Sequence, residues 1–261
     1  MSGTTIAILV LLATQSATTP SPAAILYEGD RANVSFEPGQ LSKEQMERFV
    51  SQVERGIKDI ESYLNGGARL VRPDAKISYR VASDIPMSRS FRRSVLLPME
   101  RVKTETAPYL HETTHVLMPL RGGDMWLGEG FCSYVQSYVA EHIGGYDGYV
   151  FSWGGNANVD RLARRALAQE AGKSVLPYVG GPGIPDAIWQ ERRQVAAPFY
   201  VLSHSFVKYL IEKGGLPLVQ DMVRADDAGA ALERSTKRNL AQWKADWLLS
   251  LDSSATPPRS P

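Results

Sequence analysis

The sequence predicts an α+β fold in which a small mixed sheet comes first and a mainly helical part follows. Between residues 25 and 102 the apolar residues alternate over short runs, as in half-buried strands, whereas from about residue 107 they recur every three or four positions, as in amphipathic helices. The chain has 261 residues, of which 43% are hydrophobic and 22% charged. It can therefore bury the core of one sizeable domain or of two closely packed lobes. Strands early and helices late are typical of an α+β architecture.

The amino-terminal residues have the pattern of an export signal. Residues 6–13 form an uncharged apolar run of eight residues, and small residues follow it as far as Ala24. Such a run is too short to cross a bilayer, which needs about 20 residues, but it suits the hydrophobic region of a secretory signal peptide. We therefore expect residues 1–24 to be a signal peptide and the protein to be secreted or periplasmic, with no other membrane span. The alternative is a hydrophobic first strand of the fold.

The remaining elements follow from periodicity and turn residues. A helix is expected over residues 41–64, where apolar residues recur at helical spacing between a capping Ser42 and a pair of glycines. The expected strands are one or two within 25–36, one over 76–82 and one over 94–102. The expected later helices are about 107–118, 127–142, 158–171, 195–213 and 216–224, with two short ones between 227 and 250. The folded domain is thus expected over 25–252, followed by a disordered polar tail over 253–261.

Charge and cysteine content exclude several classes of function. The 29 Lys and Arg residues against 28 Asp and Glu residues give a formal net charge of +1, whereas a domain that binds nucleic acid through its overall charge is expected to be basic. We therefore expect no nucleic acid partner. Cys132 is the only cysteine, so the chain forms no internal disulfide and has no cysteine-rich metal site.

The segment His111-Glu112-Thr113-Thr114-His115 has the spacing of a zinc-binding helix. At 3.6 residues per turn, two histidines four positions apart lie on one helix face, so both imidazoles can reach the same zinc ion. Glu112 lies on a neighbouring part of that face and is placed to contact a metal-bound water. The alternative is that both histidines are structural and make ordinary hydrogen bonds.

A zinc ion held by two histidines needs a third protein ligand, and the sequence offers Glu129. We expect Glu129 to open a second helix after a short turn, with glycines on both sides that allow this helix to approach the first one closely. A carboxylate near a helix amino terminus is also common without a metal. Beside the histidine motif, the role of ligand is the favoured interpretation.

The two motifs together resemble those of the gluzincin metallopeptidases, whose catalytic domain is thermolysin-like and is shared by aminopeptidase N-type enzymes. His111-Glu112-x-x-His115 and Trp126-Leu127-x-Glu129-Gly130 carry the resemblance, and residues 199–210 are similar to a later helix of the family. The resemblance implies a two-lobed domain with His111, His115 and Glu129 as zinc ligands. It also implies Glu112 as the general base and Tyr200 as a stabiliser of the transition state.

Two departures from the family pattern limit what is implied. Some members place an Asp four residues after the ligand glutamate, where it orients a histidine. That position is Ser133 here, so we expect the orientation to come from elsewhere, from Asp124 or a backbone carbonyl. The Gly-x-Met-x-Asn motif that binds a substrate's amino terminus is absent from the sequence, so aminopeptidase activity is not implied.

The predicted function is zinc-dependent hydrolysis of a peptide bond in a peptide or protein substrate, by a metal-bound water that Glu112 activates. Zinc with three protein ligands keeps one position for water and lowers its pKa to about 7. The alternative is an exported, zinc-stabilised binding protein that has the fold and no hydrolytic activity. Arg89, Arg92 and Arg93 form a cluster before a candidate strand. They could meet a substrate carboxylate, although a solvated strand edge is the favoured interpretation.

Overall fold

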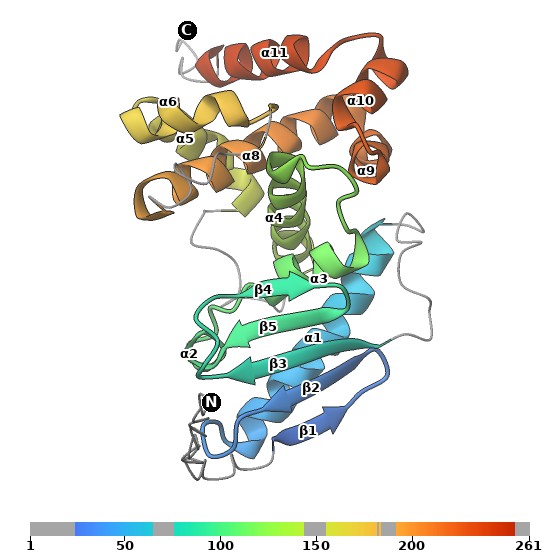
Figure 1. The fold of residues 1–261 in the computed structure, drawn as a ribbon, viewed down its shortest axis with the longest axis vertical. Coiled ribbons are helices and arrows are strands. Elements are labelled where there is room, and N and C mark those ends of the chain that lie inside the picture. The colour runs from blue at the N-terminus through green and yellow to red at the C-terminus, as the bar shows by residue number, and fades with distance from the viewer. Residues whose placement is uncertain (1–23, 65–75, 144–154, 182, 184–191, 254–261) are drawn as a thin grey trace, which may run out of the picture.

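The computed structural model describes residues 24–64, 76–143, 155–181, 183 and 192–253. The signal peptide predicted over residues 1–24 lies outside this part except for Ala24, and the predicted tail lies outside it except for Ser253. The fold has a sheet at one end, a cluster of helices at the other, and a short helix between them (Figure 1). It is a mixed fold with its strands early and its helices late, in agreement with the α+β prediction.

The sheet has five strands in the order β1-β2-β3-β5-β4. The outer pairs β1–β2 and β4–β5 are antiparallel, and the inner pairs β2–β3 and β3–β5 are parallel. Strand β4 is therefore an edge strand, and it lies on the side of the sheet nearest the helices (Figure 1). The strands are β1 (Ile25–Glu28), β2 (Ala32–Phe36), β3 (Ile77–Ala82), β4 (Arg89–Phe91) and β5 (Ser94–Pro98).

Helix α1 (Lys43–Leu64) packs its apolar stripe against the sheet, as the sequence predicts. Its start is a reciprocal cap, because Ser42 Oγ accepts from the Gln45 N–H at 3.2 Å and Gln45 Oε1 accepts from the Ser42 N–H at 2.9 Å. The ring of Phe49 lies edge-on to Phe36 of β2 and to Tyr109, at centroid distances of 6.1 and 5.6 Å. This aromatic contact joins the sheet, α1 and the helix that carries the histidine motif.

Two features of the sheet region differ from the sequence prediction. The strand expected over 94–102 ends at Pro98, and Met99–Lys103 forms the short helix α2. Met99 and Val102 are both buried at helical spacing, which the apolar run before them hides in the sequence. Strand β4 was not predicted at all. Its residues Arg-Ser-Phe lack the apolar alternation of a half-buried strand, because the strand lies at the sheet edge.

Most of the later helices form where the sequence predicts them, but one predicted helix is divided into two. The expected helix at 158–171 is two helices that meet near Gln169, which is the extended residue before α6. The helices are α3 (Tyr109–Leu117), α4 (Met125–His142), α5 (Gly155–Leu167), α6 (Glu170–Val175), the 3-10 turn η1 (Leu176–Tyr178), α8 (Arg192–Gly214), α9 (Leu216–Arg224), α10 (Ala228–Thr236) and α11 (Leu240–Ser253). No helix in these ranges combines the length and hydropathy that a membrane crossing requires.

Helix α8 is the centre of the helical part and packs against both α4 and α5. The ring of Phe206 on α8 stacks between Trp126 of α4 and Trp247 of α11, with centroid distances of 5.2 and 5.0 Å. Asp160 of α5 accepts hydrogen bonds from two side chains of α8, Ser205 at 2.7 Å and Lys208 at 2.6 Å. Through these contacts α8 fixes the position of α4.

Helix α4 approaches α8 closely at Gly130. A Cβ atom at this position would stand 2.5 Å from the carbonyl oxygen of Ser203 and 2.7 Å from a methyl carbon of Val207. The glycine therefore serves the contact with α8, and not the contact with the histidine-bearing helix that the sequence suggests. On the other side of Glu129, Gly128 lies against Leu120 and His115 instead.

We predict that Gly130→Ala destabilises the fold by about 1–3 kcal/mol, because the added methyl group meets a helix backbone that cannot move aside. The measurement is the free energy of unfolding by denaturant. Gly123→Ala is the matched control, since nothing lies within 4 Å of a Cβ at that position. Equal stability of the two variants would contradict the close approach of α4 to α8.

Candidate metal centre

Helix α3 is held between the sheet, α1 and α4. Its Thr113 hydroxyl lies 2.6 Å from the hydroxyl of Tyr79 on strand β3, within the buried core. On its other side, Gly56 of α1 leaves room for the side chains of Tyr109 and Leu110. These contacts fix the rotation of α3 about its axis, and with it the direction in which the histidines point.

Helix α4 presents a polar stripe to α3. Glu129, Ser133 and Gln136 are spaced at four and then three positions, so they share one face of the helix. The helix begins at Met125, two residues earlier than predicted. Glu129 therefore lies in the second turn of α4. The expectation that Glu129 opens this helix is wrong.

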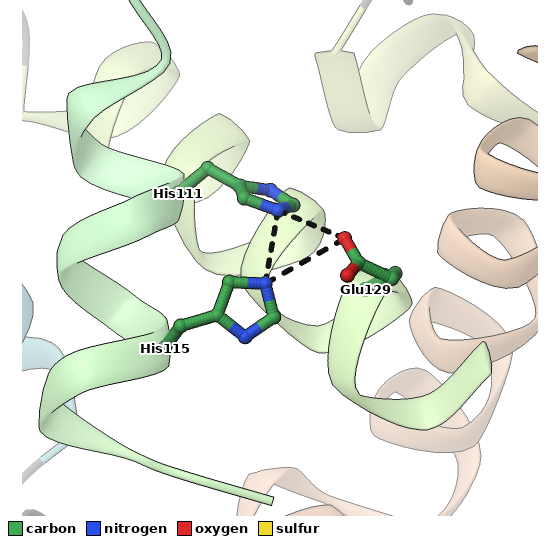
Figure 2. A group of neighbouring side chains, drawn as sticks. All are labelled: His111, His115 and Glu129. Atoms are coloured by element: carbon green, nitrogen blue, oxygen red, sulfur yellow. Dashed lines mark hydrogen bonds and ion pairs between the residues drawn. The ribbon is translucent and has the colours of Figure 1, made fainter. Parts of the chain in front are cut away.

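The side chains of His111, His115 and Glu129 meet between α3 and α4 (Figure 2). His111 Nε2 lies 3.1 Å from Glu129 Oε2 and 3.1 Å from His115 Nε2, and His115 Nε2 lies 3.5 Å from the same glutamate oxygen. The three side chains are 11%, 21% and 18% exposed, respectively. They form a small triangle of ligand atoms that is mostly shielded from solvent and still reachable from one side.

The dimensions and chemistry of this triangle fit a zinc ion. Zinc stands about 2.0–2.2 Å from nitrogen and oxygen ligands in a tetrahedral arrangement, so two of its ligands are about 3.3–3.6 Å apart. The observed separations of 3.1, 3.1 and 3.5 Å lie at or just below this range. Two imidazoles and one carboxylate are also the ligand set of open, catalytic zinc sites. The described side chains can hold zinc without rearrangement of the backbone.

Each imidazole has a partner on α4 behind it. The Ser133 hydroxyl lies 3.4 Å from His111 Nδ1, and the buried Cys132 thiol is close enough to His115 to affect its pKa. The expectation that Ser133 is unable to orient a histidine is therefore wrong, and Asp124 makes no hydrogen bond to either ring in the described part of the chain. Partners of this kind set the tautomer and orientation of a metal-binding imidazole.

Gln136 joins the two ligand-bearing helices through the backbone. Its Oε1 accepts from the His111 N–H at 2.7 Å, in the buried interface. His111 is in the first turn of α3, where backbone N–H groups have no partner within the helix, and Pro108 before it offers no side-chain cap. Gln136 thus caps α3 at a ligand residue and fixes its position relative to Glu129.

The charges within the cluster support one another. Burial on its own raises the pKa of Glu129, but hydrogen bonds from His111 and His115 and their positive charge hold it well below its usual range. Burial on its own lowers the pKa of His115, yet contacts with Cys132 and Glu129 raise it well above its usual value. Positive charge at the centre of the cluster is therefore stabilised, whether protons or a metal ion supply it.

Glu112 lies on the same helix as the two histidines, and Tyr200 lies on α8; neither belongs to the triangle of ligand atoms. The Glu112 side chain is 7% exposed on α3 between the two histidines, and its charge acts on Cys132, the partner of His115. Tyr200 is half-buried on α8, one turn before the buried His204. Burial, together with the charges of His111 and Lys208, lowers the pKa of His204 to about 3.

Sequence reasoning missed the supporting residues Cys132, Ser133 and Gln136. A signal for two of them was present, since Ser133 and Gln136 are polar residues at helical spacing from Glu129 in a helix whose first three turns are mostly apolar. Cys132 gave no such signal. Only the packing of α4 on α3 shows that this buried thiol lies close to His115.

No protein-family model matches this chain, and no curated protein sequence does. The chain is similar in structure to the M1 zinc metallopeptidase from Deinococcus radiodurans, with 15% identity over 90% of this chain and 53% of that chain and a TM-score of 0.47. A mutant of that enzyme gives 15% identity over 92% and 54% of the two chains and a TM-score of 0.48.

A two-domain M1 zinc metallopeptidase mutant bound to L-arginine is similar at 15% identity, over 92% of this chain and 52% of that chain, with a TM-score of 0.45. The chain thus spans about half the length of these structures. Likeness at this level carries no conclusion about function. The interpretation of the site depends on its own geometry.

Proposed function

We propose that this protein is a zinc-dependent metallopeptidase of the gluzincin type. The observation that carries the proposal is the triangle of His111, His115 and Glu129, whose ligand atoms lie 3.1–3.5 Å apart, with Glu112 beside it on the same helix. A metal site with a purely structural role has no need of a carboxylate next to its ligands. This extra carboxylate favours hydrolysis over a binding function.

In the proposed mechanism each side chain has one task. His111, His115 and Glu129 hold the ion, which when bound leaves one position for water and lowers its pKa. Glu112 accepts a proton from the attacking water and then delivers it to the leaving amine of the peptide bond. Ser133, Cys132 and Gln136 keep the histidines in place, so that this proton transfer occurs at a fixed geometry.

We assign stabilisation of the negatively charged oxygen in the transition state to the hydroxyl of Tyr200. The motif resemblance and the position of Tyr200 on α8, one turn before His204, support this assignment. A hydroxyl donor in a site partly shielded from water stabilises such an oxygen without having to be reorganised during the reaction.

Tyr200→Phe is expected to lower kcat by about 10²–10³-fold with little change in KM, because the lost hydrogen bond forms mainly in the transition state. Steady-state kinetics on a cleaved peptide is the measurement. Tyr209→Phe, on the same helix, is the matched control and is expected to leave kcat unchanged. A kcat for Tyr200→Phe equal to that of the wild type would assign the role to another residue.

The proposed function is tested on the full chain with a diverse peptide mixture read by mass spectrometry. Zinc content is measured first by competition with a chromophoric chelator. Cleavage by the zinc-loaded protein, its loss on chelation and its return with added zinc would support the proposal. A folded protein that binds zinc and cleaves no peptide would instead support the zinc-stabilised binding protein. Absence of zinc binding would contradict both.

Export of the protein is part of the proposal and depends on the sequence alone. It is supported by the apolar run and the small residues predicted to form a signal peptide, and residues 1–23 lie outside the described part of the chain. Accumulation of a processed chain outside the cytoplasm of an expressing bacterium would support it. Retention of the full-length chain inside the cell would argue against it.

A further inference from the structure

A cavity of about 440 Å³ opens beside the metal centre, between the end of α3 and the edge strand of the sheet. His115 lines one side of it, and Phe91, Arg92 and Arg93 at the β4–β5 turn line another. Val116 and Leu120 add an apolar surface. A molecule in this cavity would therefore touch a proposed zinc ligand and two arginine residues at once.

Neither arginine of this cavity has an acidic partner within the described ranges of the chain. The described ion pairs lie within helices or between other elements, and none of them includes a residue of the β4–β5 turn. The Arg92 guanidinium lies 5.2 Å from the ring centre of Phe91, which is itself 67% exposed. The Arg92 guanidinium is thus packed against Phe91, and no ion pair of the described residues neutralises the charge of Arg92 or Arg93.

The backbone at Arg92 adds a second, independent observation. Arg92 and Arg93 are the two central residues of a tight hairpin, and Arg92 has a φ of 54°. Glycine or asparagine is favoured where such a turn requires a positive φ, because a longer side chain is strained there. Arginine at this position therefore makes the turn less stable than glycine would. Strained residues of this kind gather at functional sites.

We propose that this cavity binds a carboxylate of the peptide substrate, with Arg92 and Arg93 as specificity-determining residues. The inference rests on the proposed function and specifies its substrate class. Guanidinium groups match carboxylates in geometry and form charge-assisted hydrogen bonds with them. The apolar wall accepts the rest of the side chain. An acidic side chain near the scissile bond and the carboxylate at the end of a short peptide have the same chemistry.

The test uses a synthetic peptide mixture in which every sequence occurs with Glu or with Gln at one position, and with a free or an amidated carboxyl terminus. Cleavage rates are measured with the zinc-loaded wild type. Retention of the same mixture is measured on immobilised Glu112→Gln protein, which gives a readout independent of turnover. We expect the Glu or the free-acid forms to be preferred about tenfold in both measurements, less at high salt. The Glu/Gln and acid/amide comparisons identify the source of the carboxylate.

Variants of the hairpin separate a local contact from general charge. The double variant Arg92→Gln/Arg93→Gln is expected to lose the preference, whereas Arg89→Gln removes the same charge from the same hairpin outside the cavity and should keep it. Arg92→Gly should weaken the preference without lowering the melting temperature, because glycine suits the positive φ. An arginine with only a structural role would not combine a weaker carboxylate preference with an unchanged melting temperature on substitution.

The outcomes distinguish failure of the two proposals. Cleavage and retention without any preference for carboxylate forms would overturn this inference and leave the peptidase proposal intact. Equal loss of preference in Arg89→Gln and in the double variant would also overturn it. If no peptide is cleaved, the peptidase proposal fails, and retention on the immobilised protein still decides whether the cavity binds carboxylates.

Discussion

Replacing Glu112 with glutamine should lower kcat/KM by about 10²–10⁴-fold while zinc content and fold remain unchanged, since a positioned general base contributes this much to a hydrolytic reaction. Glutamine has nearly the same shape as glutamate but accepts no proton. Glu112 is 7% exposed, and its carboxylate is not one of the three clustered ligand groups. The loss should therefore appear in turnover and not in metal affinity.

The measurement combines steady-state kinetics, zinc titration and thermal unfolding on the same preparation. Glu233→Gln makes the same chemical change at an exposed position of α10 and is expected to behave as wild type. Wild-type turnover by Glu112→Gln would exclude Glu112 as the base. Loss of zinc together with turnover would instead indicate that Glu112 supports the metal site itself.

Glu129→Ala should weaken zinc binding by more than about 10²-fold, because even the loss of a residue that only supports a ligand typically costs 10–100-fold. The substitution removes one corner of the ligand triangle and leaves two histidines, which hold zinc weakly. We expect the fold to be retained, since α4 is held by contacts with α8 that do not involve Glu129. Hydrolysis should be lost along with the metal.

Competition between the protein and a chromophoric chelator measures this affinity. Glu141→Ala is the matched control, because Glu141 is an exposed carboxylate near the other end of the same helix. Zinc affinity of Glu129→Ala equal to that of the control would remove Glu129 from the ligand set. The site would then need a different third ligand.

Sequence periodicity was sufficient for the elements with one strongly apolar face. Helix α1 and strand β3 were predicted nearly to the residue. Their buried positions follow a period of 3.6 residues in the helix and of 2 residues in the strand. Periodicity did not predict strand β4, because an edge strand needs no apolar face. Its partner β5 supplies the core residues. The α2 helix was hidden because Pro98, Met99 and Val102 continue the apolar run of β5.

For the metal centre, the residues that are close in sequence could be predicted and those that depend on packing could not. His111 and His115 follow from helical geometry, and Glu129 from a motif in the next helix. The partners of the two imidazoles depend on the angle at which α4 crosses α3, which Gly130 and Trp126 set through their contacts with α8. That angle is a property of tertiary packing. The arginines of the β4–β5 turn line one cavity with His115, and this too depends on tertiary packing.

The short distance along the chain between the ligands has a consequence for folding. His111 and Glu129 are 18 positions apart, whereas the hydrogen bond from Gln220 to the Leu64 carbonyl joins residues 156 positions apart. Closing the loop therefore costs about 2 kcal/mol less for the ligand triangle than for joining α9 to the end of α1. The α3–turn–α4 unit can form as a local nucleus before these distant segments meet. A metal ion that binds this unit early would stabilise it during folding as well as in the folded protein.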